Sequence, residues 1–210
     1  MKPFAAALAY NIDSNREGTM AVYDFGGGTF DFTLARVAGG QFEVISQAGD
    51  PWLGGQDFDR ALAEHAANVF EREHHIDLRR RQVEWQQLLL LCEGVKHRLS
   101  TMEQTDLLAR GMLRSVRGPV ELRLPFDREL LAKLCFSLVH RSLEVASDCM
   151  GEAHVTPEGV DQVVVTGGIS RIPLVRAQVQ KFFHRPLEMM VSPEQAIVVG
   201  NTLYGATLTE

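Results

Sequence analysis

The sequence predicts an α/β fold, and three observations support this class. Residues 19–23 form a short apolar and β-branched run, and beyond a cluster of glycines apolar and polar side chains alternate from residue 30. Residues 161–166 form another apolar strand, which leads into a pair of glycines. Apolar side chains also recur at helical spacing along residues 127–152. Buried strands combined with long amphipathic helices are typical of α/β proteins.

The chain is expected to reverse direction at residues 24–31, between two antiparallel strands. The turn contains three successive glycines: Gly26, Gly27 and Gly28. Without Cβ atoms this backbone lets a ligand approach closely, and its amide N–H groups can form an anion-binding concavity to which Thr29 adds a hydroxyl. Asp24 and Asp31 flank the turn, where they could hold a metal ion through its waters or orient an attacking water. The motif therefore predicts a phosphate-and-magnesium hairpin, with Asp24, Asp31 and Thr29 as catalytic candidates.

The same segment is not a dinucleotide fingerprint. A Rossmann loop needs G-x-G-x-x-G opening into a helix, and a Walker loop ends in Lys followed by Ser or Thr. Neither pattern occurs at residues 24–31. A glycine-rich hairpin with ordinary surface aspartates remains the alternative interpretation.

Further along the chain, helices are predicted at about residues 57–74 and 81–100, followed by a polar β region at 104–124. The long helix after it is expected at about residues 127–152, with Asp127 as the candidate N-cap and Gly151 as the candidate stop signal. These elements predict two subdomains. The inner one combines residues 1–53 with 128–210, and residues 54–127 form an inserted outer α+β subdomain.

The three cysteines show no C-x-x-C spacing. Cys135 and Cys149 fall on the long helix about 21 Å apart at helical rise, too far to form a disulfide. We expect all three to be buried thiols in a reducing cytoplasm.

Composition excludes several kinds of protein. A formal net charge of −6 gives no electrostatic basis for binding nucleic acid or an anionic membrane. No apolar run approaches the ~20 residues of a membrane span. The seven histidines show no zinc-ligand spacing. A compact cytoplasmic protein is expected.

Several separate motifs, in order along nearly the whole chain, resemble the seventy-kilodalton heat-shock chaperones of the DnaK type. The motifs are residues 3–10, 24–31, 48–59, 92–100 and 163–173. The resemblance implies the second lobe of the nucleotide-binding domain, an actin-like, ribonuclease H-like ATPase lobe with an inserted subdomain. It also implies ATP or ADP and Mg²⁺ as cofactors, with magnesium held through water by Asp24 and Asp31.

The resemblance assigns nucleotide contacts to both parts of the chain. Beyond the hairpin glycines, the matching positions are Glu93, Lys96, His97, Ser100, Gly167, Gly168, Arg171, Ile172 and Glu194. Glu93, Lys96 and Ser100 lie three and four residues apart, so helical geometry places them on one face. An ordinary surface ion pair between Glu93 and Lys96 is the alternative.

The sequence departs from the family pattern at several of these positions. His97 stands where the family has an arginine over the adenine, so we expect weaker adenine binding. Ile169 replaces a hydroxyl residue, Glu194 replaces an aspartate, and Phe25 replaces a leucine. Lys2 stands where the family has a glutamate near the metal, which reverses the charge there.

The resemblance implies the ATP- or ADP-binding half of a chaperone ATPase, which would be one lobe of a longer protein. Its partners would be the first ATPase lobe, a peptide-binding domain, and a nucleotide-exchange factor on the outer subdomain near Gln56 and Arg60. We expect the lobe alone to bind nucleotide weakly or undetectably and not to hydrolyse it. The alternatives are a nucleotide-insensitive chaperone interaction module, or a sugar kinase or actin-like ATPase.

Overall fold

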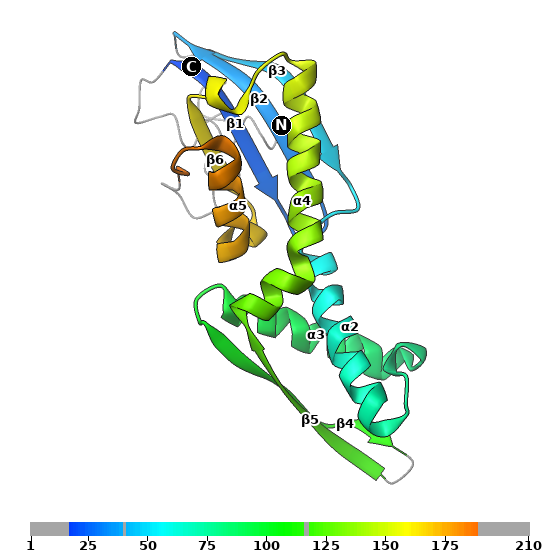
Figure 1. The fold of residues 1–210 in the computed structure, drawn as a ribbon. Coiled ribbons are helices and arrows are strands. Elements are labelled where there is room, and N and C mark those ends of the chain that lie inside the picture. Colours follow the sequence, from blue (N-terminus) through cyan, green and yellow to red (C-terminus); the bar gives the residue numbers. More distant parts are fainter. Residues whose placement is uncertain (1–16, 40, 116–117, 189–210) are drawn as a thin grey trace, which may run out of the picture. The chain divides into compact units, whose positions relative to one another are not determined.

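The structure is a computed structural model that describes residues 17–39, 41–115 and 118–188. The chain divides into two compact units. Unit 1 comprises residues 1–55 and 139–210, and unit 2 comprises residues 56–138. Figure 1 shows the helices and strands of both. No helix in the described ranges is long and apolar enough to span a bilayer.

Some predicted features lie outside the described residues. They are the motif at residues 3–10, Lys2 and Glu194. The subdomain boundaries also stay a prediction, because residues 128–138 belong to unit 2 although the sequence suggested a boundary at residue 127.

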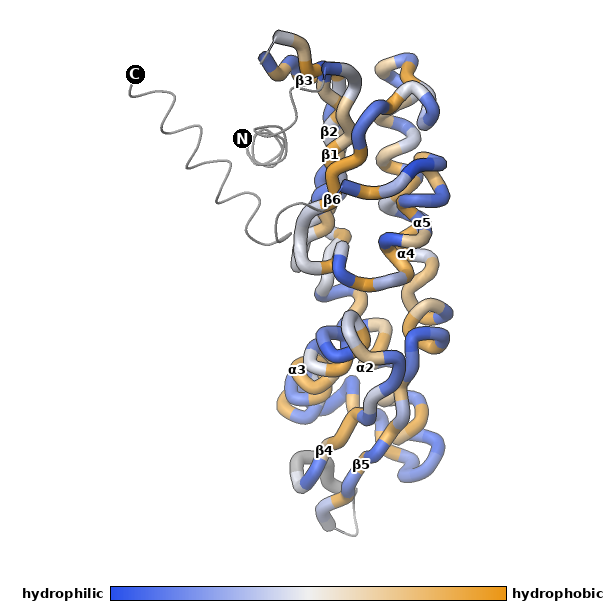
Figure 2. Tube along the Cα trace, turned by 90° about the vertical axis from the view of Figure 1, so that its left-hand side faces the viewer, coloured by the Kyte–Doolittle hydropathy of each residue, from blue (hydrophilic) through white to orange (hydrophobic). Residues whose placement is uncertain are grey.

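Unit 1 is built on a four-stranded mixed sheet with the order β3-β2-β1-β6. Its strands are β1 (Gly18–Phe25), β2 (Phe30–Ala38), β3 (Gln41–Asp50) and β6 (Gln162–Thr166). β1 pairs antiparallel with β2 and parallel with β6, so it lies between these two strands in the sheet. Figure 2 shows orange, hydrophobic segments in the region of β1 and β6. The predicted hairpin and the predicted apolar strand are both confirmed.

Aromatic side chains fill the core of unit 1. Tyr23, Phe25, Phe30 and Phe32 are fully buried, and the ring centroids of Tyr23 and Phe30 lie 4.6 Å apart. Phe183, at the end of α5 (Pro173–Phe183), stacks on Phe32 with ring centroids 6.3 Å apart. These contacts anchor the two strands on both sides of the glycine turn.

Helix α4 (Arg128–Glu152) matches the long helix that the sequence predicts. Its N-cap is confirmed, because the Asp127 carboxylate accepts a hydrogen bond of 2.7 Å from the Leu130 amide. The predicted end at about residue 152 is confirmed, but Gly151 is not the residue that stops the helix. The helix continues to Glu152, and the left-handed residue that ends it is His154, with a φ of 54°.

The described part of unit 2 contains the helices α2 and α3, the first part of α4 and a two-stranded sheet. The elements are α2 (Gly55–His74, which begins at the unit boundary), η1 (Leu78–Arg80), α3 (Gln82–Leu99), β4 (Gln104–Ser115) and β5 (Gly118–Asp127). β4 and β5 pair antiparallel. The predicted helices and the polar β region are therefore confirmed, with ends shifted by one to three residues.

Arg79 connects the short helix η1 to α2. Arg79 donates to Asp77 at 2.6 Å and to Glu64 at 3.0 Å, and it also pairs with Glu71. These bonds fix η1 to the side of α2. The Arg80 side chain, in contrast, is 87% exposed.

Candidate functional site

The glycine turn is a closed hairpin whose tip lies at the surface. The Gly26 amide donates to the Thr29 carbonyl at 2.9 Å, which closes the turn. Phe25 and Phe30 pair at its base and are fully buried. The next residues outward, Gly27, Gly28 and Thr29, are exposed.

The glycines of the tip face open space. A Cβ atom added to Gly27 or Gly28 would meet nothing within 4 Å. An incoming group can therefore approach the backbone there, with no side chain in the way. This is the geometry that an anion-binding turn requires.

A second loop packs against the back of this tip. The Gly55 amide donates to the Gly26 carbonyl at 3.0 Å. A Cβ atom on Gly54 would lie 2.4 Å from the Cα atom of Gly28, so only glycine fits there. The loop after β3 therefore supports the hairpin from behind.

Two carboxylates stand at the base of the hairpin. Asp24 and Asp31 are direct partners in the antiparallel pair, so their side chains project from the same face. Asp24 is 7% exposed and Asp31 is half-buried. The Thr29 hydroxyl points towards Asp31, with 3.4 Å between Oγ1 and Oδ2. Two carboxylates and one hydroxyl thus lie directly beside the open glycines.

The second glycine motif begins against this base. Thr166, the last residue of β6, pairs with Asp24. Gly167 has a φ of 83°, and a Cβ atom on it would lie 2.2 Å from the Phe25 carbonyl oxygen and 2.9 Å from Asp24 Oδ1. The structure therefore brings together two motifs about 140 residues apart at the carboxyl ends of parallel strands, where open α/β sheets bind ligands.

The residues after Gly167 separate into buried and exposed side chains. Gly168 and Arg171 are exposed, at the two ends of η3 (Gly168–Arg171). Ile169 and Ile172 are 4% and 2% exposed, so both belong to the core. Ile169 therefore makes apolar core contacts at a position where the family pattern has a hydroxyl residue.

The remaining predicted contacts lie on α3 in unit 2. Glu93 and His97 are exposed, with 3.9 Å between Glu93 Oε1 and His97 Nε2. The Ser100 hydroxyl donates to the His97 carbonyl at 2.7 Å. Lys96 is only 6% exposed, so the alternative of a surface pair with Glu93 is wrong.

Lys96 has a partner that the sequence reasoning missed. Its ammonium lies 2.8 Å from Asp59 Oδ2, and both groups are buried. Burial raises the pKa of Asp59, and the nearby Lys96 opposes that rise. Asp59 comes from α2, 37 residues earlier, so no local spacing predicts the pair.

The cysteines are not candidates for nucleophilic catalysis. All three are buried free thiols, as the sequence predicted. Burial raises the pKa of Cys92 and of Cys135 to about 12, which keeps both protonated.

A family model described as Hsp70 protein matches residues 2–210. The chain belongs to the Hsp70 family. This membership confirms the predicted α/β, actin-like ATPase fold, and it identifies the chain with the nucleotide-binding ATPase part of a chaperone. It leaves no reason to retain the sugar kinase or actin-like alternative.

Hsp70 ATPase domains bind nucleotide with Mg²⁺, and the hairpin fits such a ligand. Its open glycine backbone offers amide donors to phosphate oxygens. Asp24 and Asp31 offer the oxygen ligands that magnesium prefers, either directly or through water. Among the described residues no group of three or more His, Cys, Asp and Glu side chains could hold a metal by itself. A metal here would therefore depend on phosphate oxygens as well.

Proposed function

We propose that this chain is the second lobe of an Hsp70 nucleotide-binding domain and contributes the phosphate hairpin and adenosine contacts to its ATPase. The observation that carries the proposal is the open backbone at Gly27 and Gly28 beside the paired carboxylates Asp24 and Asp31. Residues 1–53 with 128–210 would form the inner subdomain and residues 54–127 the outer one.

Each residue of the hairpin has a proposed role. The amides of Gly27 and Gly28 would donate to phosphate oxygens, and the Thr29 hydroxyl would add a further donor. Asp24 and Asp31 would hold the waters of a magnesium ion and orient the attacking water. Bound magnesium would supply positive charge that balances the phosphates.

The adenosine end would be recognised by exposed side chains. Arg171 offers a planar cation for stacking on adenine. Glu93 and His97 are exposed on α3, and His97 supplies a ring that is mostly neutral at pH 7. Because His97 replaces an arginine, adenine affinity would be lower than in the family pattern.

The lobe alone would bind nucleotide weakly and would not turn it over. Phosphoryl transfer depends on neutralising charge on the phosphates, and the segment 24–31 contains no cationic side chain. Missing two or three charge-assisted contacts would weaken binding roughly a thousandfold. We propose that the first ATPase lobe supplies those contacts, and that an exchange factor and a peptide-binding domain are further partners.

The hairpin proposal can be tested with Gly28→Ala. Its Cβ would point into open space, so the fold should be unchanged while phosphate approach is blocked. We expect at least a tenfold loss of Mg²⁺-ADP affinity by equilibrium dialysis at millimolar nucleotide. Gly151→Ala, another glycine with open space around its Cβ, is the matched control and should bind as the wild type does. Equal affinity of Gly28→Ala and the wild type would refute the proposal.

A nucleotide-insensitive interaction module is the second candidate. It is favoured by two apolar side chains on the outer face of α3, since Val83 is 65% and Leu90 is 68% exposed. They lie seven residues apart, so they share one helical face. Absence of any ADP binding by the wild-type chain in the same dialysis would favour this candidate.

A further inference from the structure

A buried ion pair joins helices α2 and α3 of unit 2. Lys96 on α3 and Asp59 on α2 lie 2.8 Å apart, with side chains 8% and 11% exposed. Residues close to the pair in the chain are apolar and fully buried, among them Leu62 and Ala63 on α2 and Val95 on α3. Burying two charges is expensive, and apolar residues of similar size often give equal or greater stability.

The pair is also incompletely bonded. Asp59 Oδ1 is buried and has no hydrogen-bond partner in the part of the chain that the structure describes. Buried polar atoms without partners are rare in native proteins and are often connected with function. A contribution to stability alone therefore accounts poorly for this carboxylate.

The position of Lys96 suggests what the carboxylate does. Lys96 is one residue from His97 and one helical turn from Glu93, the exposed candidates for adenosine contact. A lysine side chain has a flexible four-carbon stem, and its ammonium carries three N–H donors. A fixed carboxylate at 2.8 Å removes most of that flexibility before any ligand arrives.

We infer that Asp59 is a positioning residue, whose carboxylate holds the Lys96 ammonium ready to donate to the hydroxyls of a nucleotide ribose. Asp59 acts through Lys96 and does not touch the ligand. This inference rests on the proposed nucleotide-binding function. It adds to that function the residue that orders the ribose contact, and it separates ribose recognition from phosphate binding at the hairpin.

The pairing itself can be tested without ligand, by measuring how fast each lysine amine is reductively methylated. Lys133 and Lys181 are exposed and serve as internal controls. In the wild type Lys96 should react at least tenfold more slowly than either. Asp59→Asn should raise the Lys96 rate about tenfold without changing the controls, and Asp59→Glu should restore slow labelling. A Lys96 rate unaffected by Asp59→Asn would overturn the inference.

The ribose contact can be tested by comparing Mg²⁺-ADP with Mg²⁺-2′,3′-dideoxy-ADP, which lacks both ribose hydroxyls. The wild type should bind ADP about tenfold more tightly, and Asp59→Asn should bind the two ligands equally. Pyrophosphate affinity should be the same in both proteins. A preference for ADP that survives in Asp59→Asn would overturn the inference and leave the proposed function standing.

A wild-type experiment covers the case in which Asp59→Asn does not fold. ADP should slow the methylation of Lys96 further, and dideoxy-ADP at equal occupancy should not. Equal protection by both ligands would overturn the inference. Failure of ADP to bind the wild type at all would overturn the proposed function and this inference together, a result distinct from the others.

Discussion

Single glycines separate the packed side of the hairpin from its open tip. Gly54 and Gly167 are positions where a Cβ atom would collide with backbone, at 2.4 Å and 2.2 Å, whereas Gly28 has no neighbour within 4 Å of its Cβ position. The first two residues shape the site, and the third leaves it accessible. The sequence could identify the glycines of the hairpin, but not which of them pack and which are open, because that depends on loops distant in the chain.

Gly167→Ala should be strongly destabilising. Its φ of 83° is unfavourable for alanine, and the new methyl group would lie 2.2 Å from the Phe25 carbonyl oxygen. We expect a loss of roughly 2–4 kcal/mol in the free energy of unfolding, measured in urea. Gly151→Ala, within α4, should change stability by less than about 1 kcal/mol. A neutral Gly167→Ala would mean that β6 does not end against the hairpin as described.

Tyr23 and Ser142 form a second residue-scale test. Both are fully buried and hydrogen-bonded to each other, and the Ser142 hydroxyl donates to the Val139 carbonyl at 2.6 Å. Ser142→Ala would strand the buried Tyr23 hydroxyl at a cost of about 1–3 kcal/mol, whereas Tyr23→Phe should cost only about 0.5–1.5 kcal/mol. Urea unfolding of both variants checks the order. Because the Ser142 hydroxyl donates to Val139, Tyr23 is assigned as the donor to Ser142. A larger loss of stability in Tyr23→Phe than in Ser142→Ala would contradict this assignment.

At the scale of elements, periodicity predicted which segments are helices and strands. It could not predict the long-range polar contacts that fix those elements together. Arg79 of η1 is bound by carboxylates of α2. The alternative interpretation paired Lys96 with Glu93 at the surface, but Asp59 of α2 pairs with Lys96 in the interior. In both cases the partner lies on another helix, so local spacing carries no signal. The error at Gly151 is different, because His154 takes the left-handed position usually given to glycine.

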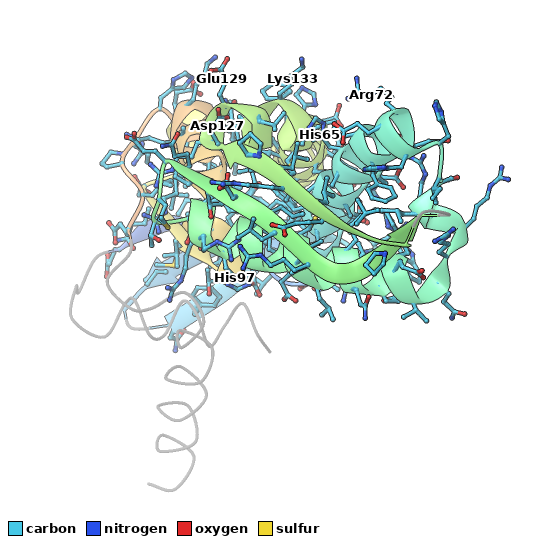
Figure 3. All side chains as sticks on the ribbon, turned by 90° about the horizontal axis from the view of Figure 1, so that it is seen from below. His65, Arg72, His97, Asp127, Glu129 and Lys133 are labelled. Atoms are coloured by element: carbon cyan, nitrogen blue, oxygen red, sulfur yellow. The ribbon has the colours of Figure 1, made fainter. Side chains whose placement is uncertain are left out.

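His65 should make the stability of unit 2 depend on pH. Burial, together with the positive charges of Arg72 and Lys133, lowers its pKa below the ordinary 6.5 (Figure 3). As pH falls below about 6.5, the unfolded chain takes up the His65 proton before the folded chain does. The free energy of unfolding therefore decreases, and this decrease ends once the pH is below the pKa of His65 in the folded state. His65→Gln should therefore lose less stability than the wild type between about pH 7 and 5 in urea unfolding.

His140 provides the control for that experiment. Its side chain is 59% exposed, so His140→Gln should retain the pH dependence of the wild type. Parallel curves for the wild type and His65→Gln would show that His65 does not cause the effect. Figure 3 shows His97 on a different side of unit 2 from His65, so the nucleotide candidates should not disturb this measurement.

For the whole molecule, the account expects further nucleotide contacts from another ATPase lobe. It predicts that the chain alone hydrolyses ATP no faster than the buffer background, measured as phosphate release with magnesium. The reason is that charge neutralisation by the hairpin alone is incomplete. Turnover near that of a complete chaperone ATPase domain, and abolished by Asp24→Asn, would contradict this prediction.

The most direct test of the central claim is a ¹⁵N NMR titration of the wild-type chain with Mg²⁺-ADP. The amide signals of Gly27, Gly28 and Thr29 report on the proposed phosphate contact itself. The account predicts that these three signals shift in a saturable manner and that inorganic pyrophosphate shifts them too. Saturable ADP binding that leaves the three amides unshifted would contradict the account, because the nucleotide would then bind elsewhere.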